Sequence, residues 1–261
     1  MKNDELYLLD LKNFFSYQKY FCKSDLRSFY RNKYKVLEEK TFRRILYALE
    51  RDNIIIAKDT GIYTLRKEDN FQPRKKFIPI FTPELKLMSD SIQKIFPYTK
   101  ILIWETRILY DFMLHLPGQN SKILETEEEA IESIFNFLQN QFPGKVFMEP
   151  GQEILEKYVS RSTESIIVST MIKRSPCLRV NGIPCPKLEK ILVDIFSDKN
   201  KFYIFQGQEL ITIYKTAFQN YKISERTLFW YAERRKVHQK LRTFIQNYTE
   251  IQLIHSKGMN K

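Results

Sequence analysis

The chain has 261 residues and carries 43 Lys and Arg against 31 Asp and Glu, a formal net charge of +12 at pH 7. Hydrophobic residues make up 43% of it and glycines number 7, which excludes a disordered or collagen-like chain and is enough for a substantial core. The basic balance favours a polyanionic partner without separating DNA from RNA or an anionic membrane surface. The length predicts two domains.

Cysteines and histidines give no sign of a metal or redox site. Cys22, Cys177 and Cys185 are odd in number and lack CxxC spacing, and the three histidines are scattered, so we expect no disulfide framework, no metal and no cofactor. The apolar stretches are too short to cross a bilayer, and residues 1–5 lack the apolar core of a signal peptide. We therefore expect a cytoplasmic protein with no membrane partner.

Residues 1–67 predict three helices followed by a two-stranded hairpin. The first helix is expected after Asn3 or Asp4 and the second after Ser24, because Asn, Asp and Ser accept hydrogen bonds from the free amides of a first helical turn. The apolar side chains expected on these helices are Leu6, Leu9, Phe14 and Phe15 on the first and Leu26, Phe29 and Tyr30 on the second.

The third helix opens the segment 38–66. Its apolar positions recur at i, i+3, i+4 and i+7, which makes one buried stripe. They are Phe42, Ile45, Leu46 and Leu49. Residues 54–57 and 62–65 are β-branched, apolar runs on either side of a turn at 59–61, which predicts a hairpin. Three helices and a hairpin in this order are typical of a winged helix-turn-helix, whose third helix reads DNA.

Basic side chains on the outer side of this third helix are the candidate DNA contacts. The side chains expected to read bases are Lys40, Thr41, Arg43, Arg44 and Tyr47. Those expected to hold phosphates are Lys35, Arg51, Lys58 and Arg66. Residues 1–67 carry 15 Lys and Arg against 9 Asp and Glu, so about a quarter of the chain carries half of the net charge. These observations predict binding to duplex DNA, and the alternative is an ordinary solvated helix face.

Residues 68–76 are polar, include Pro73 and show no periodic pattern, so they are expected to form a linker. From 77 to 261 the predicted elements alternate in the manner of an α/β domain that ends in helices. The expected strands are 77–81, 100–104, 121–126, 146–148, 166–170 and 177–180. The first expected helix opens at 82–84 and has Leu87, Met88, Ile92 and Ile95 inward. The other expected helices are 108–116, 127–141, 186–195, 208–220 and 224–247.

The last of these helices carries a second basic surface that could meet nucleic acid or an acidic protein. Its cationic side chains are Arg234, Arg235, Lys236, Lys240 and Arg242.

The sequence contains no phosphate-binding glycine loop, nucleophile elbow or clustered metal motif. Its nearest candidates for chemistry are Glu105, Glu125 and Glu127 at predicted strand ends. Metal-dependent nucleases of the restriction-endonuclease type use Glu-x-Lys, whereas this chain has Glu-Thr-Glu, and Arg107 is a poor proton acceptor. We expect these to be surface carboxylates without a lysine partner, and we expect no catalytic residue. The alternatives are a metal-dependent nuclease with a winged-helix targeting module and a winged-helix adaptor that binds protein.

Two segments resemble antitoxins of the AbiEi (abortive-infection, type IV toxin-antitoxin) family. Residues 184–196, PCPKLEKILVDIF, resemble its P-x-LEK-x-LVD segment, and residues 231–235, YAERR, resemble its later YA-x-RR helix. Residues 205–210 and the strand that contains Trp104 also match a related group of uncharacterised proteins. The resemblance covers nearly the full chain, although aromatic insertions around residue 203 depart from the family pattern.

The resemblance implies a transcriptional autoregulator that represses its own operon and opposes a nucleotidyltransferase-type toxin, usually without a stable complex with it. It also implies that the second domain has a degenerate restriction-endonuclease-like fold. The expected partners are therefore the operator DNA of its own operon and, functionally, the cognate toxin of a toxin-antitoxin or phage-defence pair.

Overall fold

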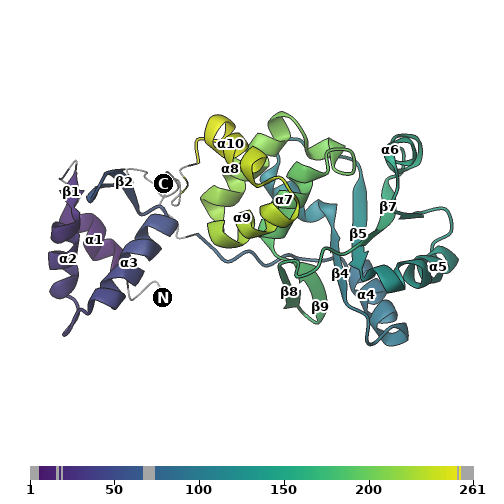
Figure 1. Cartoon of the computed structure of the whole chain (residues 1–261), viewed down its shortest axis with the longest axis horizontal. Coiled ribbons are helices and arrows are strands. Elements are labelled where there is room, and N and C mark those ends of the chain that lie inside the picture. Colours follow the sequence, from purple (N-terminus) through teal and green to yellow (C-terminus); the bar gives the residue numbers. More distant parts are fainter. Residues whose placement is uncertain (1–5, 16–17, 19, 67–73, 252, 254–261) are drawn as a thin grey trace. The chain divides into compact units, whose positions relative to one another are not determined.

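The computed structural model describes residues 6–15, 18, 20–66, 74–251 and 253 (Figure 1). The chain divides into two compact units, Met1–Lys75 with Ile254–Lys261, and Lys76–Leu253. Both units combine helices with small sheets. Of the predicted linker, residues 68–73 lie outside the described residues.

The smaller unit places its helices and strands in the predicted order. Its elements are α1 (Leu8–Phe15), β1 (Phe21–Cys22), α2 (Lys23–Arg31), α3 (Glu39–Arg51), β2 (Ile55–Asp59) and β3 (Ile62–Leu65). The strands form an antiparallel sheet in the order β1-β3-β2. Strand β1 was not predicted, because two residues are too few to show an alternating pattern.

Aromatic side chains dominate the core of the smaller unit. The rings of Phe15 and Phe21 stack with their centroids 4.1 Å apart, and the buried Tyr30 hydroxyl donates to the Leu6 carbonyl at 2.7 Å. Leu9 and Phe14, two of the apolar side chains expected on the first helix, are 80% and 54% exposed. The buried side of α1 consists of Leu11 and Phe15, which are spaced i, i+4 and so lie on the same face of the helix.

The predicted caps of the first two helices have different outcomes. Asn3 and Asp4 lie outside the described residues. Helix α2 begins at Lys23 with Cys22 as its N-cap, so the prediction that Ser24 caps it is wrong. The Asp25 carboxylate accepts a hydrogen bond from the Cys22 amide at 2.8 Å, which fixes the first turn one residue earlier than the sequence pattern indicated.

The larger unit contains the remaining elements. In chain order they are α4 (Pro83–Ile95), β4 (Ile101–Glu105), η2 (Thr106–Phe112), β5 (Asn120–Thr126), η3 (Glu128–Ala130), α5 (Ile131–Gln141), β6 (Val146–Met148), α6 (Gln152–Ile154), η4 (Leu155–Val159), β7 (Glu164–Thr170), β8 (Cys177–Val180), β9 (Ile183–Pro186), α7 (Leu188–Ser197), η5 (Tyr203–Phe205), α8 (Gln208–Asn220), α9 (Glu225–Arg234) and α10 (His238–Tyr248). A four-stranded sheet runs in the order β4-β5-β7-β6, and β8 pairs with β9. Strand β4 is antiparallel to β5, whereas β5, β7 and β6 are parallel.

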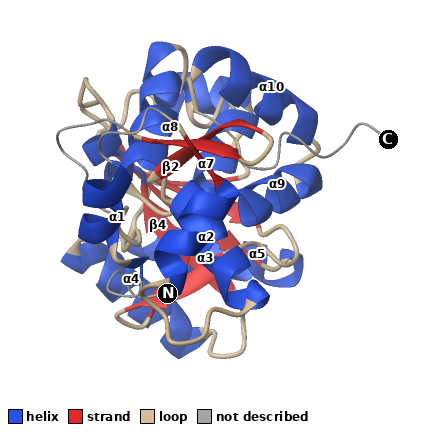
Figure 2. Ribbon diagram, turned by 90° about the vertical axis from the view of Figure 1, so that its left-hand side faces the viewer, coloured by secondary structure: helices blue, strands red, loops and turns tan. Residues whose placement is uncertain are grey.

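Helices pack on both faces of the four-stranded sheet. Figure 2 shows the helices of the chain in blue and its strands in red. On β5, Ile123 joins the core cluster of α7, α8, α9 and α10, while its neighbour Leu124 joins the cluster of α4 and α5. On β7, Ile167 joins the same cluster as Ile123, and Val168 joins the same cluster as Leu124. Successive strand side chains point to opposite faces, so two cores form on one sheet.

Near the start of the larger unit, one prediction is wrong and another is confirmed. Residues 77–81 form no strand, since Pro79 has no amide to donate, and the Phe77 ring packs against Phe112 and Tyr221 instead. The predicted opening of a helix at 82–84 is confirmed, because α4 begins at Pro83, and the hydroxyl of its N-cap Thr82 accepts from the Leu85 amide at 3.3 Å.

The buried face of α4 differs from the one predicted. Met88 and Ile92 are buried as expected, but Leu87 and Ile95 are 67% and 55% exposed. Leu85 completes the buried side of the helix, at i−3 from Met88.

Helix ends were also misplaced. The predicted helix 108–116 is a 3₁₀ segment at 106–112, and the helix predicted from residue 186 begins at Leu188, because Pro186 belongs to β9. The predicted helix 224–247 is two helices, since Lys236 adopts a left-handed φ of 56° and ends α9.

Candidate nucleic-acid interface

Helix α3 separates an apolar side from a basic one. Phe42, Ile45 and Leu49 are fully buried, as their spacing predicted, and Ala48 is buried between them. Helix-favouring residues such as Arg, Leu and Glu fill most of the other positions. The helix is therefore held by its apolar side, and its outer side chains face solvent.

Four of the predicted base-reading residues lie together on that outer side. Lys40, Arg43, Arg44 and Tyr47 line one shallow, open hollow, and all four are exposed. Thr41, the fifth residue predicted to read bases, is half-buried and does not line the hollow. Guanidinium groups, an ammonium and a phenol at one open surface can donate to phosphate oxygens or to acceptors on base edges.

Glu39, which the sequence analysis did not single out, also lines this hollow. Its carboxylate pairs with Arg43 at 3.2 Å and with Arg27 at 2.8 Å. Desolvation opposes the charged form, but the hydrogen bond from Arg43 and the charge of Arg27 together lower the pKa of Glu39. The i, i+4 spacing of Glu39 and Arg43 is the signal from which this pair could have been predicted. Glu39 thus holds Arg43 in place and reduces the positive charge of the hollow.

The hairpin after α3 forms where it was predicted. In its turn the Asp59 carboxylate accepts from the Thr60 amide at 2.7 Å, and Gly61 has a φ of 72°, which favours glycine. The ladder contains a bulge between Ala57 and Asp59, which increases the local twist of the hairpin.

Of the predicted phosphate contacts, Lys35, Arg51 and Arg66 do not line the hollow. Lys35 is exposed in the loop between α2 and α3. Arg51 is half-buried and its guanidinium binds the Asp52 carboxylate at 2.9 and 3.1 Å, a hydrogen bond that raises the pKa of Arg51. Arg66 follows β3 and is half-buried, and the side chain of Lys58 lies outside the described residues. Arg51 would have to leave Asp52 to hold a phosphate.

Arg74, at the end of the predicted linker, is buried in the smaller unit. Its guanidinium donates to the Arg51 carbonyl at 2.7 Å, close to the C-terminal end of α3, where a cation is favourable.

Two of the three carboxylates considered for catalysis, Glu105 and Glu125, are buried and are not the surface groups that were expected. Glu125 binds the Lys190 ammonium of α7 at 2.6 Å and Glu127 pairs with Lys100, so the prediction that these glutamates lack a lysine partner is wrong for both. Lys190 also binds Asp194, whose carboxylate accepts from the Tyr231 hydroxyl at 3.0 Å. The sequence could not reveal the pair, since Glu125 and Lys190 are 65 residues apart.

The charges of this buried network depend on one another. Burial would lower the pKa of Lys190, but the carboxylates of Asp194 and Glu125 outweigh burial and raise it. Burial, helped by repulsion from Asp194, raises the pKa of Glu125 even though Lys190 opposes the shift. Lys190 is only 1% exposed, so its ammonium faces the network and not solvent. This geometry suits a structural link between β5 and α7.

The other two glutamates differ from each other. Glu105 is fully buried and accepts from the Thr82 amide at 2.7 Å and from Asn120 at 3.3 Å, so it was wrongly predicted to be a surface group. Through the hydrogen bond from Thr82, Glu105 links the start of α4 to the end of β4. Glu127 forms a more exposed pair with Lys100 at 3.1 Å.

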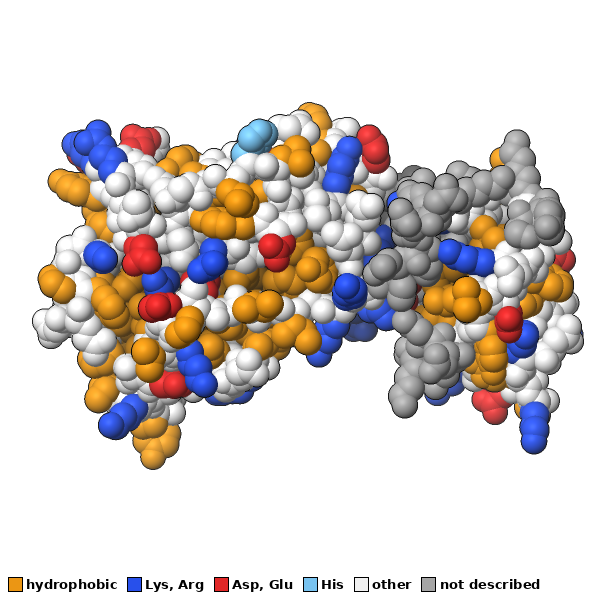
Figure 3. Space-filling view, turned by 180° about the vertical axis from the view of Figure 1, so that it is seen from behind, with side chains coloured by type: hydrophobic (Ala, Val, Ile, Leu, Met, Phe, Trp, Pro, Cys, Tyr) orange, Lys and Arg blue, Asp and Glu red, His pale blue; other side chains and the backbone are white. Residues whose placement is uncertain are grey.

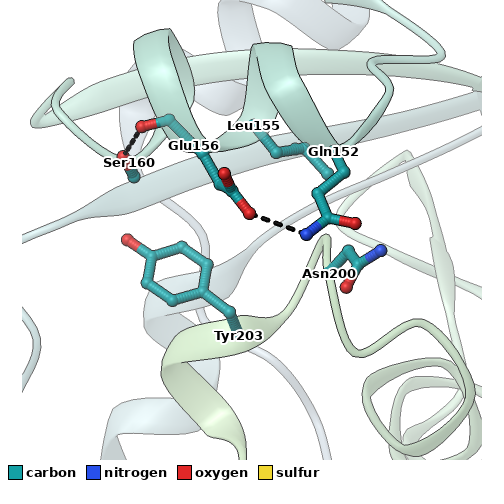
Figure 4. A pocket seen from close by; sticks show the side chains of 6 residues that line it. All are labelled: Gln152, Leu155, Glu156, Ser160, Asn200 and Tyr203. Carbon is teal, nitrogen blue, oxygen red and sulfur yellow. Dashed lines mark hydrogen bonds between the residues drawn. The ribbon is translucent and has the colours of Figure 1, made fainter.

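A cavity of about 270 Å³ lies against the π-helical turn η4 (Figure 4). Its lining residues are Gln152, Leu155, Glu156, Ser160, Asn200 and Tyr203. The Gln152 amide donates to the Glu156 carboxylate at 2.8 Å. Since these residues include one carboxylate and no cation, the cavity suits a phosphate less well than the hollow on α3 does.

A second group of exposed cations lies on α9 and at the start of α10, where Arg234, Lys236 and Lys240 are exposed. On the face of the larger unit seen in Figure 3, basic, acidic and hydrophobic side chains are interspersed. Within the described part of the chain, no three His, Cys, Asp or Glu side chains converge to hold a metal ion. The cysteines Cys22, Cys177 and Cys185 are free. None of the described helices combines the length and apolarity needed to cross a bilayer.

Comparison with known families places the chain in a family of unknown function, DUF6577. The family pattern matches residues 41–251, from the first turn of α3 to the residues after α10, so the chain belongs to this family. A search of curated proteins found no match.

Proposed function

We propose that the protein is a DNA-binding transcriptional regulator whose smaller unit is a winged helix-turn-helix. The observation that carries the proposal is the convergence of Lys40, Arg43, Arg44 and Tyr47 on the exposed side of α3. The order of three helices and a twisted antiparallel hairpin supports it, because in winged modules the third helix enters the major groove and the hairpin contacts the backbone.

Burial supports the same assignment of roles within α3. The apolar stripe keeps the helix rigid against its own unit, so the basic side chains can meet DNA without unfolding anything. Arg44 and Lys40 are exposed, and no acidic partner of either is found within the described residues. Arg43 has Glu39 as its partner and would exchange it for a phosphate or a base.

Fluorescence anisotropy with a duplex from the region upstream of the protein's own gene tests the proposal. Arg44→Ala should weaken binding by about 1–3 kcal/mol, roughly five- to 150-fold in Kd, because a bidentate contact to a base is lost. Lys40→Ala should reduce the slope of log K against log salt by about one if Lys40 binds a phosphate.

Lys94→Ala on α4 is the matched control, since it removes an equally exposed cation from the larger unit. The DNA affinity of Lys94→Ala, and the slope of its log K against log salt, should equal those of the wild type. Unchanged binding by both Arg44→Ala and Lys40→Ala would remove α3 as the reading helix, and absence of any salt-dependent DNA retention would favour a protein-binding adaptor.

We propose further that the regulator represses its own operon and acts as the antitoxin of a nucleotidyltransferase-type toxin. This narrower role rests on the resemblance of residues 184–196 and 231–235 to AbiEi-type antitoxins. Co-expression with the product of the adjacent gene tests it. Co-expression of the wild-type protein should restore growth, and Arg44→Ala should leave the promoter of the operon derepressed. If the adjacent gene product does not inhibit growth when it is expressed alone, the antitoxin role is contradicted.

A further inference from the structure

Helix α9 exposes one narrow face of unusual composition. Arg226, Trp230 and Arg234 recur at i, i+4 and i+8, so they lie in one row along the helix. All three are exposed, while Leu228 and Tyr231 on the other side are fully buried. The row is therefore a surface feature and not part of the core.

Trp230 is the unusual member of this row. Its side chain is 43% exposed, whereas the other tryptophan of the chain, Trp104, is fully buried and stacks on Phe202. Leaving an indole in water forgoes a large gain from burial, and exposed tryptophans are enriched where another molecule covers them. The Arg234 guanidinium lies 5.3 Å from the centre of the Trp230 ring, which makes a flat, cationic platform.

Further exposed cations follow this row in the chain, where α10 packs beside α9 (Figure 1). Lys236 and Lys240 are exposed at the joint between the two helices and on the first turns of α10. The joint is fixed, because the Arg242 guanidinium lies 4.5 Å from the centre of the Phe229 ring, and that ring also contacts His238. Glu233 is the one acidic residue among the exposed positions of α9.

We propose that this face, formed by Arg226, Trp230, Arg234, Lys236 and Lys240, binds single-stranded nucleic acid. Trp230 with Arg234 would stack on an unpaired base, and the other three cations would hold the adjoining phosphates. A single strand fits better than a duplex, whose base faces are already covered by their neighbours. The proposal does not rest on DNA binding by α3.

Tryptophan fluorescence of the full chain reads this contact directly. Titration with a 20-nucleotide oligothymidylate should quench the emission of Trp230, since stacking on a base quenches indole, while buried Trp104 should stay unaffected. In Trp230→Phe the quenching should disappear. The Kd of this variant for the oligonucleotide, measured by fluorescence anisotropy, should stay within about threefold of the wild-type Kd. Trp230→Ala should bind about five- to 150-fold more weakly, the range found for loss of one stacked base.

Matched controls separate this face from other surfaces. Tyr158→Ala removes another exposed aromatic ring of the larger unit, and Lys94→Ala removes an exposed cation of α4. Both should keep the quenching and the affinity for oligothymidylate. Quenching that a duplex produces equally well, binding to polyglutamate as tight as to oligothymidylate, or unchanged affinity in Trp230→Ala would each overturn the proposal.

Discussion

At the scale of single residues, Lys190 lies at the centre of a buried network of charges in the larger unit. Its ammonium lies between the carboxylates of Glu125 and Asp194 and 5.3 Å from the centre of the Tyr231 ring. We expect Lys190→Met to lower the free energy of unfolding by about 3–5 kcal/mol, because two buried carboxylates would lose their cation. Urea unfolding measured at neutral pH checks this value.

Lys145→Met is the control for this substitution, since Lys145 belongs to a half-exposed pair with Glu164 at 4.0 Å and should change stability by less than about 1 kcal/mol. Alkaline pH gives a second readout. The folded chain holds the Lys190 proton more tightly than the unfolded chain, so this contribution is lost as the pH rises above the ordinary pKa of 10.5. Above this pH the difference in free energy of unfolding between the wild type and Lys190→Met should therefore become smaller. A difference that stays constant with pH would contradict a charge-based role of Lys190.

At the scale of elements, the turn of the hairpin depends on one glycine. Gly61 has a φ of 72° with open space around it, so an added Cβ meets strain in the backbone and not a clash with a neighbour. Gly61→Ala should cost about 1–2 kcal/mol of stability in the smaller unit. Gly118→Ala, also in open space but without a left-handed φ, should be neutral or slightly stabilising. Equal effects of the two substitutions in thermal unfolding would show that the turn does not require glycine.

Elements with a strong local pattern could be predicted from the sequence. The spacing of apolar residues located α3, α5 and α7, and short β candidates at 121–126 and 166–170 located β5 and β7. The hollow on α3 was predictable for the same reason, because its four predicted residues lie on one helix and local spacing fixes their common side.

Features that depend on distant residues could not be predicted in this way. Glu125 and Lys190 are 65 residues apart in the sequence and meet only through packing of α7 against the sheet. Lys236 ends α9 in a left-handed conformation that its own side chain does not favour, so the packing of α10 decides this break.

At the scale of the whole molecule, each unit has hydrophobic cores of its own. The smaller unit is built on the cluster that contains Leu49, and the larger unit has two clusters on the faces of its sheet, one of which contains Leu192. A unit with its own core can unfold as a cooperative unit. This arrangement would let the smaller unit keep its fold and the basic side of α3 when the larger unit is destabilised.

Leu49→Ala and Leu192→Ala test this independence, since both side chains are fully buried. Each should cost about 2–5 kcal/mol, but only in its own unit. Hydrogen exchange followed by mass spectrometry should show faster exchange in α1, α2 and α3 for Leu49→Ala, and in α7, α8 and α9 for Leu192→Ala. DNA binding should decrease in Leu49→Ala and persist in Leu192→Ala, because only the first substitution loosens the support of α3. Exchange that accelerates in both units for either substitution would mean that the chain unfolds as one body, and loss of DNA binding in Leu192→Ala would place an essential contact in the larger unit.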